Sequence, residues 1–98
     1  MFSIEANADG KITLAGRLDA SQSMTAQAGF DACNGQLVAD CSHLDYISSA
    51  GLGVLLKTQK RLLAAGGKLR LVGVNRHIKD IFQYSGFDLI VEIEALAE

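Results

Sequence analysis

The chain has 98 residues, of which 49% are hydrophobic and 20% charged, and its formal net charge is −2. This length and composition are typical of one folded domain, spanning residues 1–98, with a single modest core. A weakly acidic chain gives no reason to expect nucleic-acid binding, which usually needs a basic face. Because no run of about 18 uninterrupted apolar residues exists, we expect no membrane insertion. The first residues lack the pattern of a signal peptide, so we expect a cytoplasmic protein.

The cysteines and histidines do not form a metal-binding pattern. Cys33 and Cys41 belong to separate predicted elements and form no C-x-x-C motif, so we expect free, reduced thiols that are partly buried. His43 and His77 lie far apart in sequence, and we expect both to be ordinary surface or boundary residues. We therefore predict neither a metal site nor a cofactor site.

The first part of the chain predicts a β-hairpin. Apolar and polar residues alternate over 2–6 and again over 11–18, with turn residues at Ala8-Asp9-Gly10 between them. Gly16, inside the second of these segments, indicates a bulge or a close backbone approach. The small residues over 20–33 then favour a helix, although Gly29 weakens that prediction. The best core candidates of this helix are Met24, Ala28 and Phe30.

A buried strand is predicted over 36–42, and the clearest helix follows it over about 50–65. The expected core face of this helix carries leucines at helical spacing, namely Leu52, Leu55, Leu56, Leu62 and Leu63. We expect Lys57, Thr58, Lys60 and Arg61 on the other faces of the helix, with the three basic residues solvated. Gly66 and Gly67 stand where a helix commonly ends in a left-handed residue.

The remaining segments predict a strand over 68–74, a helix that begins after Asn75 and ends at Ser85-Gly86, and a last strand over 89–93. The helix would bury Ile78, Ile81 and Phe82, which share one face. Strands separated by helices imply parallel pairs, and the opening hairpin adds an antiparallel edge. The fold class is therefore α/β, with a mixed sheet of about five strands and helices chiefly on one face.

A polar corner stands out between the buried strand and the leucine-rich helix, where residues 45–53 read Asp-Tyr-Ile-Ser-Ser-Ala-Gly-Leu-Gly. It delivers Ser48 and Ser49 to a helix amino terminus, where backbone N–H groups lack partners and the helix dipole favours negative charge. A serine there is either an N-cap or the attachment point of a phosphate. Asp19 and Asp45 are turn or cap acids unless the fold brings Asp19 near Ser49.

Enzyme motifs are missing from the corner. The run Ile-Ser-Ser-Ala-Gly is no nucleophile elbow, and neither histidine has an orienting acid placed by the sequence. Gly51-Leu-Gly53 lacks the third glycine of a dinucleotide-binding fingerprint, and no Gly-Lys-Ser/Thr of a P-loop is present. We therefore expect a protein that is not an enzyme.

Four segments of the chain resemble the STAS domain, the fold of bacterial anti-sigma factor antagonists. The corner and the helix after it, Asp45-Tyr-Ile-Ser-Ser-Ala-Gly-Leu-Gly-Val-Leu-Leu56, are similar to the signature segment of that family. The other matches are Thr13-Leu-Ala-Gly-Arg-Leu-Asp19, Ala64-Ala-Gly-Gly-Lys-Leu-Arg-Leu-Val-Gly-Val74 and Ile81-Phe-Gln-Tyr-Ser-Gly-Phe87. Their order along the chain agrees with the family, and together they cover nearly its whole length.

The resemblance implies a transcription regulator that acts by partner switching. The unphosphorylated form would bind an anti-sigma factor that is also a serine protein kinase with a histidine-kinase-like ATPase fold, and would thereby release a sigma factor or an equivalent target. Phosphorylation, at the position that matches Ser49, would switch binding off, and a serine phosphatase would reset it. Ser48 stands where aspartate is usual. The expected partner-binding residues are Asp19, Tyr46, Ser48, Ser49, Gly51 and Leu52.

A second interpretation of the same resemblance is a STAS accessory subunit of a transport or signalling assembly. In that protein Ser49 would serve only as a helix cap, and no phosphorylation switch would exist.

Overall fold

The computed structural model describes residues 2–7 and 10–95. Its elements, in chain order, are β1 (Phe2–Ala6), β2 (Lys11–Leu18), the 3₁₀ turn η1 (Ala20–Gln22), α1 (Ser23–Asp31), β3 (Gln36–Ile47), α2 (Ser49–Ala64), β4 (Lys68–Val74), α3 (Arg76–Ser85), the 3₁₀ turn η2 (Phe87–Leu89) and β5 (Glu92–Ala95). This order confirms the predicted succession of strands and helices. Of the predicted first turn, Gly10 has a φ of 74°, whereas Ala8 and Asp9 lie outside the described residues.

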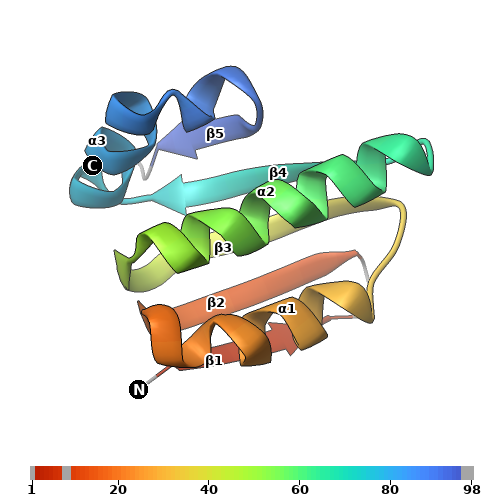
Figure 1. Ribbon diagram of the computed structural model, residues 1–98, viewed down its shortest axis with the longest axis horizontal. Helices are drawn as coiled ribbons and strands as arrows, with labels where there is room; N and C mark the ends of the chain where they lie inside the picture. The colour runs from red at the N-terminus through yellow and green to blue at the C-terminus, as the bar shows by residue number, and fades with distance from the viewer. Residues whose placement is uncertain (1, 8–9, 96–98) are drawn as a thin grey trace.

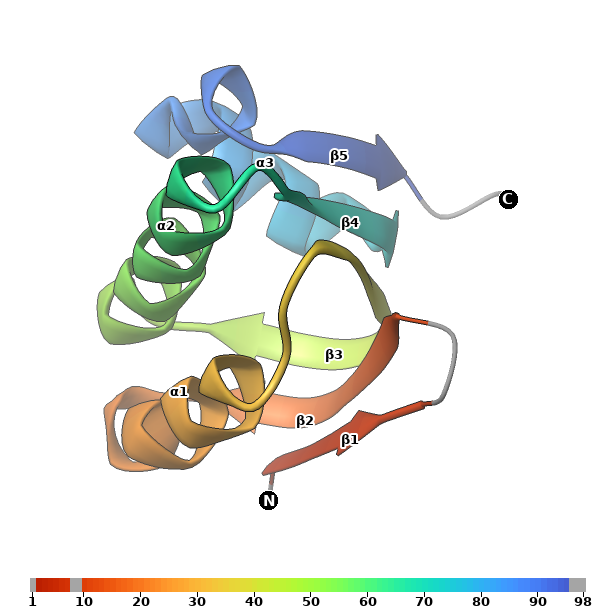
Figure 2. The ribbon, with the colours of Figure 1, turned by 90° about the vertical axis from the view of Figure 1, so that its right-hand side faces the viewer.

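The strands described form one sheet in the order β1-β2-β3-β4-β5. β1 pairs antiparallel with β2, and the other neighbours pair in parallel, which confirms the mixed sheet. α1 lies over β1 and β2, and α2 lies over β3 and β4 (Figure 1). Figure 2 shows both helices on the same face of the sheet, while α3 lies at the end where β4 finishes.

Alternating apolar residues make β2 a half-buried strand, as the sequence predicts. Ile12, Leu14 and Leu18 are almost fully buried. Gly16 has a φ of 90°, a conformation that L-residues with a side chain rarely adopt, and the register with β3 shifts between Gly16 and Arg17. The predicted irregularity at Gly16 is confirmed.

The prediction for the core face of α1 was wrong at two of its three residues. Phe30 is buried, but the side chain of Met24 is 84% exposed and Ala28 is exposed too. The helix instead turns Gly29 toward β1, where an added Cβ would lie 2.7 Å from Ile4 Cδ1. This close approach selects the face that carries Ala26 and Phe30 as the buried one.

α2 buries a face that is less leucine-rich than the sequence suggested. Leu55 and Leu62 are fully buried, as predicted, and Leu56 is only partly buried. Leu63 is 54% exposed, so its prediction as a core residue was wrong. Thr58 is buried too, so its prediction on another face of the helix was wrong, and Gln59 is buried beside it. Both side chains can be buried because each has hydrogen-bond partners.

Of the three basic residues predicted to be solvated, Lys57 and Lys60 are exposed but Arg61 is not. The half-buried guanidinium of Arg61 donates hydrogen bonds to the carbonyl oxygens of Phe30 (2.8 Å) and Cys33 (2.7 Å). It also donates to Asn34 Oδ1 at 2.9 Å. Arg61 therefore fastens the second half of α2 to the end of α1.

The helix ends follow the predicted capping residues. Gly66, with a φ of 87°, ends α2, and the Gly67 N–H donates to the Leu62 carbonyl at 2.8 Å. Asn75 caps α3 by accepting from the Ile78 N–H at 2.9 Å. Gly86 ends α3 in the left-handed region.

The last strand begins three residues later than predicted. Residues 87–89 form the turn η2, and the ring of Phe87 packs on Phe82 with centroids 5.1 Å apart. The Val91 N–H donates back to the Phe87 carbonyl, so this stretch cannot join the sheet before Glu92.

The cysteines match the expectation of free thiols, Cys33 being half-buried and Cys41 buried. Burial raises the pKa of the Cys41 thiol to about 12, so it stays protonated at neutral pH. Both histidines are exposed, as expected.

Candidate functional site

The parallel pairing of β2 and β3 brings the polar corner together with Asp19. Leu18 is paired with Ile47, so the two strands finish at the same edge of the sheet. The Ser48 N–H donates to the Leu18 carbonyl at 2.9 Å, which ties the corner to the end of β2. Asp19, the next residue after β2, therefore emerges beside the start of α2.

Ser48 is the N-cap of α2. Its backbone is extended (φ −93°, ψ 174°), and its hydroxyl oxygen accepts a hydrogen bond from the Gly51 N–H at 3.2 Å. Its carbonyl oxygen accepts the first helical hydrogen bond, from the Leu52 N–H at 2.9 Å. Of the two adjacent serines, the first one thus meets the need of the helix for a cap.

Ser49 is the first residue of α2, and it is exposed. Among the residues described, its hydroxyl group has no hydrogen-bond partner. The first turn of α2 contains no acidic side chain, so no residue of the helix itself neutralises the positive end of its dipole. A negative group attached to Ser49 would meet unpaired N–H groups and a favourable dipole.

Asp19 caps the turn η1 rather than α2. Its carboxylate accepts from the Ser21 N–H at 3.1 Å and from the Ser21 hydroxyl at 2.6 Å. The hydrogen bond from the Ser21 hydroxyl lowers the pKa of Asp19, so the group is ionised at neutral pH. It adds a negative charge near the corner.

The other expected contact residues lie in three different settings. Leu52 is partly buried beside the corner. Gly51 is buried, and it packs so closely on the strands that a Cβ there would come within 2.8 Å of both Leu18 Cγ and Ile47 Cγ1. Ile47 faces α2, so strand alternation places Tyr46 on the opposite face of the sheet, with the Arg17 guanidinium 4.3 Å from its ring centroid.

Two surface grooves that the sequence did not predict flank the first turns of α2. The Ser49 groove, of about 290 Å³, is lined by Ser49, Leu52, Gly53, Leu56, Ser85, Phe87 and Ile90. The α1–α2 groove, of about 400 Å³, is lined by Ser23, Met24, Gln27, Ala50, Gly53, Val54 and Lys57. Their walls come from segments distant in sequence, so no local pattern could have revealed them.

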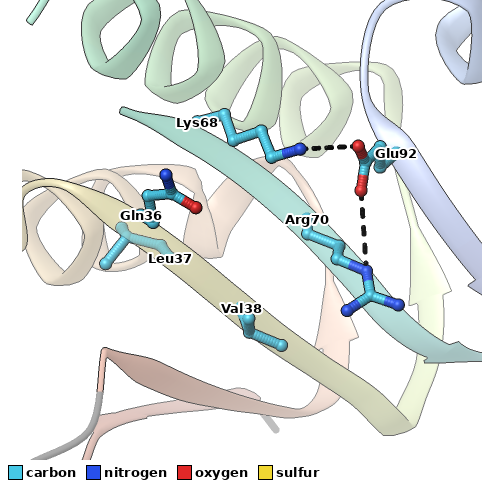
Figure 3. A pocket seen from close by; sticks show the side chains of 6 residues that line it. All are labelled: Gln36, Leu37, Val38, Lys68, Arg70 and Glu92. Atoms are coloured by element: carbon cyan, nitrogen blue, oxygen red, sulfur yellow. Dashed lines mark hydrogen bonds and ion pairs between the residues drawn. The ribbon is translucent and has the colours of Figure 1, made fainter. Parts of the chain in front are cut away.

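A further hollow of about 240 Å³ lies at the amino-terminal ends of β3 and β4, away from the corner. Figure 3 shows that the charged groups around it point toward one another. Lys68 Nζ lies 2.6 Å from Glu92 Oε1, and Arg70 Nε lies 3.6 Å from Glu92 Oε2. These ion pairs join β4 to β5, and they satisfy each other rather than face an open site.

Residues 2–7 and 10–95 contain neither a metal-binding cluster nor a membrane-spanning helix. No group of three or more side chains there could hold a metal ion. Within the same ranges, no helix is long and apolar enough to cross a membrane.

Comparison with known proteins identifies the family. Residues 3–92 match the family model described as "Mlab, STAS domain". A segment of 52 residues is 44% identical to BtrV of Bordetella bronchiseptica, named as a candidate anti-sigma factor antagonist, and it covers 53% of this chain. The segment spans 45% of that relative's length. Because the family model covers most of the sequence, the chain belongs to the STAS domain family.

Solved structures show the same fold at low sequence identity. An anti-sigma factor antagonist from Mycobacterium paratuberculosis superposes with a TM-score of 0.78 at 20% identity, over 96% of this chain and 84% of that one. The Bacillus cell fate determinant SpoIIAA in its phosphorylated form superposes with a TM-score of 0.69 at 19% identity, over 95% and 90% of the two chains. The expected STAS fold is confirmed.

Proposed function

We propose that the chain is a non-catalytic anti-sigma factor antagonist that acts in the cytoplasm by exchanging partners. Its unphosphorylated form binds an anti-sigma factor that is also a serine kinase with a histidine-kinase-like ATPase fold, and this binding frees a sigma factor or an equivalent target. Phosphorylation of Ser49 ends the interaction, and a serine phosphatase restores it. The contact surface is the corner of Asp19, Ser48, Ser49 and Leu52, with Gly51 beneath it. It extends around the end of β3 to Tyr46, on the opposite face of the sheet.

The observation that carries this proposal is that only Ser48, and not Ser49, acts as the helix cap. Ser48 caps α2, so the helix does not need the hydroxyl of Ser49. Ser49 is nevertheless exposed at the point of the helix where an anion is best accommodated. An accessible hydroxyl with no structural duty at a helix amino terminus suits a modification site.

Elementary electrostatics explains how such a modification would release a partner. A phosphoserine adds a charge of about −1.5 to −2 at neutral pH, and a helix amino terminus is among the least disruptive places for it. The domain therefore stays folded while the potential of its surface changes sharply. A partner docked over Ser49 would have to desolvate a dianion, so it dissociates without any rearrangement of the fold.

The relatives support the same conclusion. BtrV is named for anti-sigma factor antagonism, and the Bacillus determinant SpoIIAA has been solved in a phosphorylated form.

The test is phosphorylation of the full chain by the kinase fraction of source lysate with ATP, followed by intact-mass measurement. We expect one phosphate on wild type and on Ser48→Ala, and none on Ser49→Ala. Phosphorylation of Ser49→Ala at the wild-type level would contradict the proposal. No phosphate on wild type, combined with stable co-purification with a membrane ATPase, would favour the accessory-subunit interpretation.

A further inference from the structure

Two glycines in the first turns of α2 have different explanations. Gly51 is required by the fold, because a side chain there would collide with Leu18 and Ile47 on the strands beneath. Gly53 is not, since a Cβ at this position would meet no atom within 4 Å beyond its chain neighbours and the backbone of its own helix. The backbone does not require Gly53 either, because the residue has no positive φ. Glycine weakens a helix interior relative to alanine, so the fold is served worse by Gly53 than by alanine.

Gly53 lies between the two grooves and one helical turn after Ser49. It lines both the Ser49 groove and the α1–α2 groove, so no side chain stands between the two at this position of the helix. Glycine is the residue that lets another molecule approach a backbone closely. α2 thus presents no side chain at Gly53, one turn after the candidate phosphorylation site.

The Ser49 groove is uncharged, and hydrogen bonds and ring packing hold its walls in place. Its lining contains no ionisable side chain, and Leu52, Leu56, Phe87 and Ile90 make it largely apolar. The buried amide of Gln59 fixes the wall at residue 90, because it donates to the Ile90 carbonyl at 2.9 Å while accepting from the Leu69 N–H at 2.7 Å. The tilted contact of the Phe87 ring with the Phe82 ring holds the other part of the wall.

We propose that the anti-sigma factor kinase docks directly on Gly53 and inserts an uncharged, apolar side chain into the Ser49 groove. This inference rests on the proposed function, since a kinase that modifies Ser49 must cover a hydroxyl that belongs to the groove rim. The uncharged lining selects an apolar anchor, because a charged side chain would lose its hydration without gaining a partner. The contact surface therefore extends beyond the corner to the segment 85–90.

The placement also sharpens how phosphorylation would release the partner. Ser49 forms part of the groove, so its phosphate would stand beside the desolvated apolar anchor. Introduction of a dianion there would displace the anchor directly.

The experiment measures calorimetric binding of the purified kinase, identified by its phosphorylation of wild type, to four full-length variants. Gly53→Phe places a ring at the residue that lines both grooves. Leu63→Phe is its control, because it adds the same ring at an exposed position of α2 that lines neither groove. Ile90→Ala removes a groove wall, and Leu89→Ala truncates its neighbour, which is 88% exposed and lies outside the lining. Circular dichroism and melting curves check that all four are folded.

We expect Gly53→Phe to weaken binding by about 100-fold and Ile90→Ala by about tenfold, while both controls bind as wild type does. Wild-type affinity in Gly53→Phe and Ile90→Ala would overturn the docking inference and leave the phosphorylation switch intact. Equal losses in the variants and their controls would also overturn it. If wild type itself neither binds the kinase nor is phosphorylated, the proposed function and this inference both fall.

Discussion

The two ends of α2 differ in what surrounds them. The second half is held by three contacts. Leu62 is fully buried, and Gln59 hydrogen-bonds both to β4 and to the segment before β5. Arg61 donates hydrogen bonds to carbonyl groups at the end of α1. After the helix, Gly67 approaches Gly35 so closely that a Cβ would lie 2.0 Å from the Gly35 carbonyl oxygen. Gln59 and Arg61 both make hydrogen bonds within the chain, and Arg61 Nε, which makes none, lies 3.7 Å from Asp31 Oδ1.

The first turns leave a more accessible surface. Gly51 presses on Leu18 and Ile47, and Ser48 supplies the cap, but the outer surface consists of Ser49, Gly53 and two open grooves. One helix therefore combines a rigid anchor with an accessible end. The anchored half can hold the accessible half in place while the accessible half is modified or covered by a partner.

The largest effect should come from the anchored half. Leu62→Ala should lower the free energy of unfolding by about 2–5 kcal/mol, because it leaves a cavity in the core. The adjacent Leu63→Ala should cost less than about 1 kcal/mol, since that side chain is 54% exposed. Urea denaturation of both variants measures the difference. Similar losses at the two positions would mean that the buried face of α2 is misassigned.

The Arg61 anchor should come next. Arg61→Ala removes three hydrogen bonds from a charged donor and should lower the free energy of unfolding by about 1–3 kcal/mol. Lys60→Ala, on the exposed side of the same turn, should change it by less than about 0.5 kcal/mol. Thermal unfolding monitored by circular dichroism compares the two, and a silent Arg61→Ala would remove the anchor from the comparison.

The two serines should separate structure from function at the open end. Ser48→Ala should lower the free energy of unfolding by about 0.5–2 kcal/mol through loss of the N-cap. Ser49→Ala should stay within about 0.5 kcal/mol of wild type, since its hydroxyl has no partner among the residues described. Chemical denaturation of both proteins decides this. A larger loss in Ser49→Ala would make Ser49 the structural serine.

The smallest effect concerns Asp19 and pH. Its hydrogen bonds to Ser21 lower the pKa below the ordinary value of 3.8, so the ionised form favours the folded state. The contribution is present above the pKa of the unfolded chain and is lost as the pH falls through that of the folded chain. We expect Asp19→Asn to melt slightly below wild type at pH 7 and to match it in strong acid. A difference that grows on acidification would contradict this sign.

Local patterns predicted the order of elements well because the alternation in β2, the caps at Asn75 and Gly86 and the glycines after α2 each act within a few residues. In α2, the position of a residue on the helical repeat determines its burial more than whether the residue is leucine. Val54, Leu55, Thr58 and Leu62 follow the helical repeat on one face, whereas Leu63 points outward. Burial of Thr58 and Gln59 depends on hydrogen-bond partners, and the partners of Gln59 lie in β4 and in the segment before β5.

The corner was predictable for a similar reason. A polar run between a buried strand and an amphipathic helix has to lie at a helix start, and the structure places Ser48 and Ser49 there. Only the structure distinguishes which of the two serines is the N-cap, because both positions suit that role. The Ser49 groove could not be predicted, since α3, η2 and α2 meet there only in the folded chain.

The most direct test of a regulatory end on an anchored helix is calorimetric binding of the purified kinase to wild type, Ser49→Ala, Ser49→Asp and the Ser49 phosphoprotein. We predict that wild type and Ser49→Ala bind equally, because the hydroxyl has no structural duty. Ser49→Asp should bind more weakly, and the phosphoprotein should bind weakest, since a carboxylate carries less charge than a phosphate. Equal affinities for wild type, Ser49→Asp and the phosphoprotein would contradict the account and leave Ser49 without a regulatory role.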